Sequence, residues 1–198
     1  MSSQLLQIFA KAPVVGQVKT RLAVDVGSEK ACAIYKQLLT NTLNNAVSKH
    51  WPTEIWCSPD VQHPYLQSLG KQHHTQLKTQ SSGDLGERML LALQAGLTRA
   101  EKVVLIGSDC PVISVDYIQA AFDALDTSDV VFGPVEDGGY VLVACKHAGE
   151  QMFTNVEWSC AETLKQNITA IKKVGLKQDQ LSTLWDIDTV NDWQRWVQ

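Results

Sequence analysis

The sequence predicts an α/β protein in which helices cover both faces of a mostly parallel, mixed β-sheet, a three-layer α/β/α sandwich. Short apolar runs alternate with longer segments of helical period along the whole chain. Its 198 residues, 44% hydrophobic and 19% charged, are enough to bury a sizeable core. Because no repeat, low-complexity stretch or long linker interrupts the sequence, we expect a single domain over residues 1–198.

The N-terminal half starts with an apolar run at residues 5–10, which we predict to be a central strand. A loop containing Pro13 and Gly16 follows. A long helix then begins near Ser28, because apolar residues recur at helical spacing as far as Val47.

Two more strands and a capped helix come next. Residues 54–57 predict a second strand and residues 74–79 a weaker third. Asp84, with Glu87 three positions later, has the spacing of a capping box, so we expect a helix from here to about Ala100.

The C-terminal half continues the alternation. Residues 103–106 are short and rich in β-branched side chains, which predicts a buried strand, and Ser114 then caps a helix. Residues 130–132 and 140–145 predict two strands joined by a turn.

Two helices end the chain. Ser159 and Glu162 again have capping-box spacing, so we expect a helix to begin there. Thr189 is the predicted cap of a short last helix over residues 190–196.

Charge and cysteine content exclude several classes of protein. Seventeen Lys and Arg against 21 Asp and Glu give a net charge of -4, which argues against a nucleic-acid-binding surface. Five cysteines without a C-x-x-C pair favour reduced thiols over a disulfide framework or structural zinc. The N-terminal apolar run is too short for a signal peptide, and no segment is long enough to span a bilayer. We therefore expect a soluble, cytoplasmic protein without nucleic-acid or membrane partners; a homo-oligomer is left open.

A basic loop directly follows the first strand. Lys11, Lys19 and Arg21 lie within eleven residues, together with Gly16 and Thr20. Fixed cations and backbone amides on such a loop are suited to binding a di- or triphosphate. The spacing matches neither a P-loop nor a G-x-G-x-x-G fingerprint, and an exposed basic loop explains it equally well.

Asp109 follows the most hydrophobic strand. A carboxylate at the exit of a buried strand can hold Mg²⁺, which takes one or two carboxylates and completes its shell with water and substrate phosphates. The alternative is a turn that leads into a helix. Because ligands of open α/β sheets bind outside the carboxyl ends of the strands, we favour the ligand role.

Two further acidic segments are candidates. Asp137 precedes Gly138, Gly139 and Tyr140, where paired glycines either admit a ligand or, as we judge better, form a tight turn. Asp186 and Asp188 occupy alternate positions and would face the same side of an extended chain. One of them could complete the metal site, while the other orients or caps the last helix.

Three other residues have both functional and structural explanations. Arg88 sits in the first turn of a predicted helix, from where it could reach a phosphate. Trp158 and Ser159 could shape an acceptor pocket, although a Trp beside a capping box is more often a packing residue.

These segments together resemble the DUF2064 family, whose members are called transferase 1, radical-SAM/selenodomain-associated, or glycosyltransferase A-like proteins. The resemblance runs from the first strand to the last helix and is carried by residues 9–22, 83–89, 107–111, 133–140, 158–159 and 186–189.

The resemblance implies a GT-A-like fold of the nucleotide-diphospho-sugar transferase superfamily. By analogy Lys11, Lys19 and Arg21 would hold nucleotide phosphates, and Asp109 would bind Mg²⁺ (or Mn²⁺) with Asp188 or Asp186 as the second carboxylate. The two glycines after Asp137 would lie against the substrate. The glycine-rich loop of sugar nucleotidyltransferases and the D-x-D of glycosyltransferases are both replaced here.

Three functions follow as hypotheses. The first is a Mg²⁺-dependent nucleotidyltransferase that joins a nucleoside monophosphate to a phosphorylated small-molecule acceptor, with Lys19, Arg21 and Asp109 as catalytic residues. The second is a glycosyltransferase that uses a nucleotide-diphospho-sugar, with Asp137 as base. The third is a non-catalytic nucleotide-binding protein, since fold alone does not decide activity.

Overall fold

A computed structural model describes residues 2–198. In chain order the elements are β1 (Ser2–Lys11), α1 (Thr20–Val26), α2 (Ser28–Ala46), β2 (Thr53–Ser58), α3 (Pro64–Gln72), β3 (Gln76–Thr79), α4 (Leu85–Leu97), β4 (Ala100–Ile106), α5 (Val115–Ala124), β5 (Val130–Pro134), β6 (Tyr140–Cys145), the 3₁₀ turn η1 (Glu150–Met152), α6 (Thr163–Lys173), β7 (Gln178–Gln180) and α7 (Val190–Val197).

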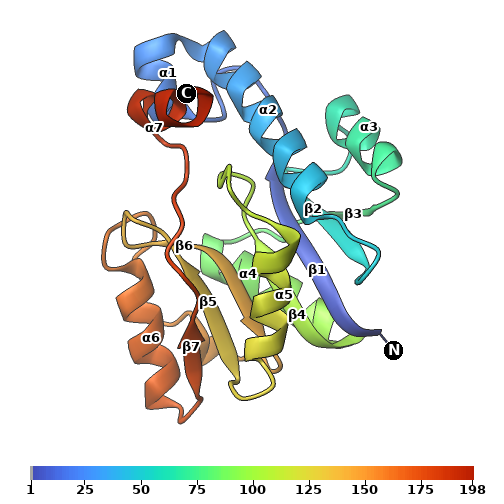
Figure 1. The fold of residues 1–198 in the computed structure, drawn as a ribbon, viewed down its shortest axis with the longest axis vertical. Coiled ribbons are helices and arrows are strands. Elements are labelled where there is room, and N and C mark those ends of the chain that lie inside the picture. Colours follow the sequence, from blue (N-terminus) through green and yellow to red (C-terminus); the bar gives the residue numbers. More distant parts are fainter. Residues whose placement is uncertain (1) are drawn as a thin grey trace.

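Within residues 2–198 the strands form a seven-stranded sheet in the order β3-β2-β1-β4-β6-β5-β7 (Figure 1). β1 is central and runs parallel to both β2 and β4, as expected. β6 is antiparallel to its neighbours β4 and β5, so the sheet is mixed. The carboxyl ends of β1, β2 and β4 therefore meet at the same edge of the sheet.

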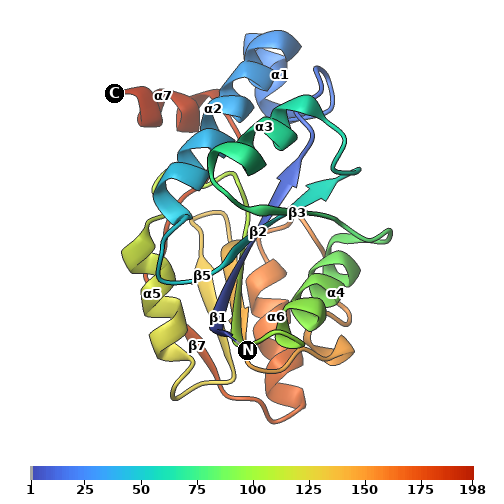
Figure 2. The ribbon, with the colours of Figure 1, turned by 90° about the vertical axis from the view of Figure 1, so that its right-hand side faces the viewer.

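Helices cover both faces of this sheet, which confirms the predicted three-layer fold. Figure 2 shows α4 and α6 on one side of the strands and α5 on the other. Side chains of β1 alternate between the two cores: Leu6 and Ile8 join the cluster beneath α2, α3 and α5, whereas Leu5 joins the cluster beneath α4 and α6. A central strand buried on both faces requires such a continuous apolar run.

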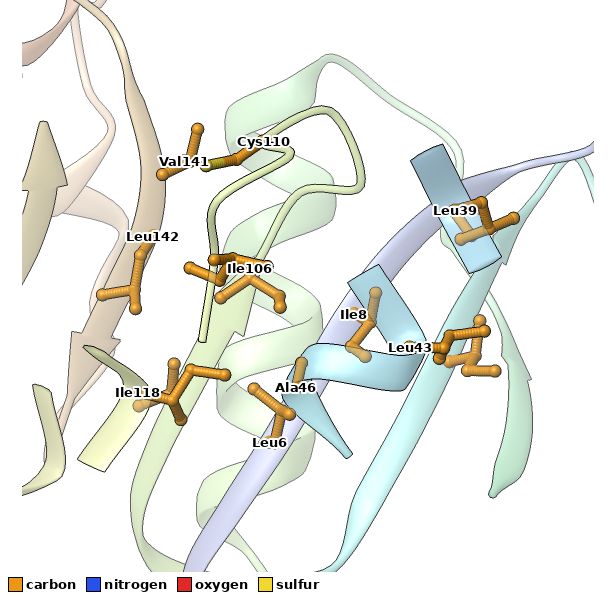
Figure 3. Close-up of a cluster of buried hydrophobic side chains, with 14 of the residues drawn as sticks. Leu6, Ile8, Leu39, Leu43, Ala46, Ile106, Cys110, Ile118, Val141 and Leu142 are labelled. Carbon is orange, nitrogen blue, oxygen red and sulfur yellow. The ribbon is translucent and has the colours of Figure 1, made fainter. Parts of the chain in front are cut away.

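The first of these cores holds the long helix α2 on the sheet (Figure 3). Leu39 and Leu43 of α2 meet Ile8 of β1, and Ile118 of α5 packs near Ile106 of β4. These five side chains are fully buried. Each contributes roughly 1.5–3 kcal/mol relative to an exposed side chain.

A third, smaller cluster fixes the end of the chain. The C-terminal helix α7 lies beside α1, at the end of the molecule where β1 finishes (Figures 1 and 2). Ile187, which is fully buried, packs with Leu22 of α1 and Leu38 of α2, and Trp193 covers them. Because Ile187 is held in this cluster, its neighbours Asp186 and Asp188 lie at the carboxyl end of the sheet.

Several sequence predictions hold in detail. Asp84 and Glu87 form the predicted capping box, with the Asp84 carboxylate accepting from the Glu87 amide at 2.9 Å. Ser114 caps α5, and Thr189 caps α7 in a capping box with Asp192.

The predicted capping box at Ser159 is wrong. Ser159 adopts a positive φ of 61°, and α6 begins only at Thr163, whose preceding residue Glu162 makes no side-chain cap. The hydroxyl of Thr163 instead turns back to the carbonyl of Cys160 at 2.8 Å. The sequence also failed to predict α1, α3 and β7, all of which are short.

The five cysteines are free thiols, and among residues 2–198 the structure contains no disulfide. None of the helices in this described part of the chain combines the length and apolar character needed to cross a bilayer.

Candidate active site

A cavity of about 640 Å³ opens at the carboxyl edge of β1 and β4. Most residues that the sequence singled out line it: Lys11, Lys19, Thr20, Arg21, Arg88, Asp109, Asp137, Gly139, Tyr140, Trp158, Ser159, Asp186 and Asp188. They come from loops that are far apart in sequence, and the sheet brings them together because its parallel strands end at this edge.

Gly16 and Gly138 do not line the cavity. Gly16 adopts a φ of 80° in the loop after β1, with open space where a Cβ would lie, so its role there is conformational. Gly138, with φ 89°, lies against the chain itself, because an added Cβ would be only 2.1 Å from the carbonyl oxygen of Ala161. Backbone contact explains this glycine.

Lys19 is the most buried charged group of the site. Its side chain is only 5% exposed, and its Nζ lies 2.8 Å from Asp109 Oδ1 and 3.3 Å from Asp188 Oδ1. Nζ also donates a hydrogen bond of 2.6 Å to the carbonyl oxygen of Ile187. Burial by itself lowers the pKa of Lys19, but the charges of the two aspartates outweigh it and raise the pKa overall. The ammonium is therefore held charged.

Arg21 lies beside this buried pair. Its Nη1 donates to Asp188 Oδ2 at 3.0 Å, while 63% of its side chain remains exposed. The five donors of a guanidinium are only partly used by this contact. Arg21 is thus anchored at the cavity and still able to bind an anion.

Three carboxylates meet on the other side of Asp188. Oxygen atoms of Asp137, Asp186 and Asp188 lie within 4.8 Å of one another. Asp137 comes from the turn between β5 and β6, and the other two come from the tail before α7. Burial, together with the charges of Asp137 and Asp188, raises the pKa of Asp186 to about 7, although the charge of Lys19 acts in the opposite direction.

The cluster of Asp137, Asp186 and Asp188 is a donor set suited to a hard divalent cation, whereas the sequence predicted Asp109 with Asp188 or Asp186. Carboxylate oxygens from different segments are the ligands that Mg²⁺ and Mn²⁺ prefer. Among residues 2–198, Asp186 forms no ion pair. Asp109 is not part of the cluster; its Oδ1 lies 2.8 Å from Lys19 Nζ and has no hydrogen-bond partner in the described part of the chain.

A clamp of Arg195, Glu136 and Trp185 ties the two acidic segments together. Arg195 of α7 binds Glu136 through both guanidinium nitrogens, at 2.8 and 3.1 Å. The same guanidinium stacks on the ring of Trp185, 4.2 Å from its centroid. Because Glu136 adjoins Asp137 and Trp185 adjoins Asp186, the clamp links the two segments that carry the cluster.

Tyr35 of α2 braces the loops from below. Its hydroxyl accepts from the Lys11 amide at 2.8 Å, donates to the Lys11 carbonyl at 3.0 Å and lies 3.4 Å from the Ser108 hydroxyl. The ends of β1 and β4 are thereby fixed to one helix. The side chain of Lys11 takes no part in these contacts with Tyr35 and donates instead to the carbonyl of Gln17.

Arg88 and Trp158 line the far part of the cavity. Arg88 donates to the side chain of Gln80 at 3.0 Å, and Gln80 is itself buried and donates to the carbonyl of Trp56. Within the described chain no carboxylate pairs with Arg88, so this cation is oriented but not neutralised. Trp158 packs on Gly86, whose missing side chain makes room for the indole.

The sequence did not predict the supporting residues. Tyr35 falls among the apolar residues of helical spacing in the predicted helix that begins near Ser28, although a tyrosine there signals a hydroxyl that needs a partner. Gln80 and the pair of Glu136 with Arg195 gave no signal, because their partners are remote in sequence.

The fold and the cavity place this chain among proteins with the nucleotide-diphospho-sugar transferase fold. A provisionally assigned nucleotide-diphospho-sugar transferase from Desulfovibrio desulfuricans G20 superposes with a TM-score of 0.87 at 30% identity, over 96% of this chain and 84% of that one. A cytidylyltransferase from Leptospira borgpetersenii superposes with a TM-score of 0.63 at 12% identity, over 98% of this chain and 84% of that one.

A glucosyl-3-phosphoglycerate synthase from Mycobacterium tuberculosis, in complex with Mn²⁺, UDP and glucosyl-3-phosphoglycerate, gives a TM-score of 0.58 at 11% identity, over 98% of this chain and 75% of that one. At such identities the last two show the shared fold. No match to a curated protein was found.

The family model described as "Uncharacterized protein conserved in bacteria (DUF2064)" matches residues 42–160. The chain belongs to the DUF2064 family, as the resemblance in its sequence implied.

Proposed function

We propose that this chain is a nucleotide-using transferase, and specifically a Mg²⁺- or Mn²⁺-dependent nucleotidyltransferase. The observation that carries the proposal is the convergence of Asp137, Asp186 and Asp188 beside the exposed guanidinium of Arg21 in one cavity. Carboxylates for a divalent ion next to a cation for phosphate oxygens are what a nucleoside triphosphate requires. The fold shared with a cytidylyltransferase supports the same reading.

In the proposed reaction, an oxygen of a phosphorylated acceptor attacks the α-phosphorus of a nucleoside triphosphate. A bond forms from that oxygen to phosphorus, the bond to the bridging oxygen breaks, and pyrophosphate leaves. Such a transfer needs positioning and charge stabilisation rather than covalent participation by the protein. A divalent ion held by the three aspartates would supply part of that stabilisation.

The cations of the chain supply the rest. Arg21 would bind the phosphates of the nucleotide, with Lys11 at the end of β1 and Thr20 at the start of α1 in the cavity wall. Arg88 would bind a second anionic group at the far end, where Trp158 and Tyr140 offer aromatic surface to the acceptor.

A glycosyltransferase that uses a nucleotide-diphospho-sugar is the second candidate. The 30% identical protein from Desulfovibrio, assigned to that class, favours it. The exposed carboxylate of Asp137 would then act as the base toward the acceptor hydroxyl.

Thermal denaturation with each nucleoside triphosphate and each common nucleotide sugar, with and without Mg²⁺, separates the two candidates. We expect Mg²⁺-dependent stabilisation by a triphosphate, and stabilisation by a nucleotide sugar alone would favour glycosyl transfer. Arg21→Gln should weaken the response at least about tenfold in ligand concentration, because it removes a charge-assisted contact. Lys49→Gln, an exposed lysine away from the cavity, is the matched control. Indifference of the wild-type protein to both ligand classes would refute the proposal.

A further inference from the structure

Lys19 occupies the place that the sequence assigned to a metal ion. The resemblance implied a divalent ion between Asp109 and a second carboxylate of the tail. In the structure the Lys19 ammonium lies there instead, 2.8 Å from Asp109 Oδ1 and 3.3 Å from Asp188 Oδ1.

The ammonium of Lys19 donates hydrogen bonds to Asp188 Oδ1 and to the carbonyl of Ile187, and it forms an ion pair with Asp109 Oδ1, which has no hydrogen-bond partner within residues 2–198. An ammonium carries three N–H groups, and three protein oxygens surround Nζ of Lys19: one from Asp109, one from Asp188 and the carbonyl of Ile187. With 5% of the side chain exposed, little of it faces the solvent of the cavity. Arg21, whose side chain is 63% exposed, is better placed than Lys19 to bind a phosphate.

The backbone of Lys19 holds the side chain in this place. Lys19 is the residue that precedes α1, with φ and ψ both 47°, a left-handed conformation that is rare outside glycine. Its carbonyl accepts the first helical hydrogen bond, from the Ala23 amide at 2.9 Å. An ion that bound both Asp109 and Asp188 would have to displace an ammonium whose backbone is anchored at both the loop and the helix.

The charges of the site point the same way. Four carboxylates, those of Asp109, Asp137, Asp186 and Asp188, line the cavity near two paired cations, Lys19 and Arg21. Lys19 neutralises the side of Asp109. The excess of negative charge remains on the side of Asp137 and Asp186, where neither has an ion pair within residues 2–198.

We infer that Lys19 is a resident cation of the site: it replaces a divalent ion between Asp109 and Asp188, and a divalent ion binds instead to Asp137, Asp186 and Asp188. Asp109 is then a positioning residue, which joins the loop after β4 to the loop after β1 through the ammonium. The inference rests on the proposed function only for the presence of a divalent ion.

Binding of Mn²⁺ alone, measured from the electron paramagnetic resonance signal of the free ion, tests the inference without any catalytic readout. We expect a single class of Mn²⁺ site in the wild-type protein. Asp137→Asn should weaken it at least about tenfold, as loss of a ligand does, whereas Asp109→Asn should change the affinity less than about threefold. Lys19→Met should add a Mn²⁺ site or tighten binding, because it releases the two carboxylates from the ammonium. Lys49→Met should leave Mn²⁺ binding unchanged.

The inference is overturned if Asp109→Asn weakens Mn²⁺ binding as much as Asp137→Asn does, or if Lys19→Met folds and binds Mn²⁺ as the wild type does. Should Lys19→Met fail to fold, the comparison of Asp109→Asn with Asp137→Asn decides by itself. If the wild type binds no Mn²⁺ while Lys19→Met does, Lys19 takes the place of a divalent ion as inferred, but the site at Asp137, Asp186 and Asp188 and the metal dependence of the proposed function are both overturned. Failure of nucleotide binding is measured separately, in the thermal denaturation panel.

Discussion

Replacing Asp186 by asparagine should stabilise the protein in the absence of metal. Burial raises the pKa of Asp186 from the ordinary 3.8 to about 7, with the charges of Asp137 and Asp188 adding to the effect. A carboxylate that ionises in such surroundings opposes folding. The site thus retains a charge that costs stability until a cation binds.

The structure sets the size and the pH range of this cost. A pKa unit corresponds to about 1.4 kcal/mol, so the shift of Asp186 gives an upper bound of about 4 kcal/mol. Asp186 is only half-buried, and solvent screening reduces the expected gain to about 1–2 kcal/mol. The unfolded chain ionises this group near pH 4 and the folded chain near pH 7. The cost is therefore absent below about pH 4, grows between the two pKa values and is complete above about pH 7.

Urea unfolding of Asp186→Asn in a chelator measures the effect. We expect the free energy of unfolding to rise by about 1–2 kcal/mol at pH 8 and to stay nearly unchanged at about pH 4. Adding Mn²⁺ should stabilise the wild type but not the variant, since the variant lacks a ligand. Asp123→Asn, an exposed aspartate of α5, is the control. A variant that is less stable than the wild type at pH 8, or equally changed at both pH values, would refute this reasoning.

Three further variants test the scaffold of the site. Arg195→Gln should leave the melting temperature almost unchanged, because its pair with Glu136 is exposed, and yet weaken Mn²⁺ binding through the loosened clamp; full Mn²⁺ affinity would show that the clamp has no role. Tyr35→Phe should lower the free energy of unfolding by about 1–3 kcal/mol, because the end of β1 loses a buried partner, and urea unfolding with an unchanged midpoint would contradict this. Gly138→Ala should lower the free energy of unfolding by about 1–3 kcal/mol or more, because the positive φ of Gly138 and the facing backbone exclude a Cβ. Gly107→Ala, which has open space where the Cβ would lie, should change it by less than about 0.5 kcal/mol. Equal effects of the two variants would refute the packing argument.

The sequence predicted the fold well wherever a long periodic segment carried the signal. The helix beginning at Ser28 is of this kind, because it combines an apolar stripe with a clear boundary; the strand ending at Ile106 was instead predicted from a short run of buried, mostly β-branched side chains. Short elements were not predicted. Helix α1 has a single buried residue, Leu22, and β7 contains no apolar residue, so neither has a periodic pattern. The false capping box at Ser159 shows that spacing alone cannot reveal a left-handed backbone.

The site was predicted as a set of residues but not as an arrangement. The rule that ligands gather at the carboxyl ends of strands brought Arg21, Asp109 and Asp188 together correctly in one cavity. It could not say that Lys19 lies between two aspartates, because the contact with Asp188 joins residues 169 positions apart. Whether an aspartate faces a lysine or a metal ion depends on such tertiary contacts, which no local pattern encodes.

The most direct test of the account is a crystal of the wild-type protein soaked with Mn²⁺ and the triphosphate that stabilises it best. The anomalous signal of manganese should lie among Asp137, Asp186 and Asp188, with the phosphates of the nucleotide on Arg21 and the Lys19 ammonium still between Asp109 and Asp188. Manganese between Asp109 and Asp188, or a nucleotide bound outside this cavity, would contradict it.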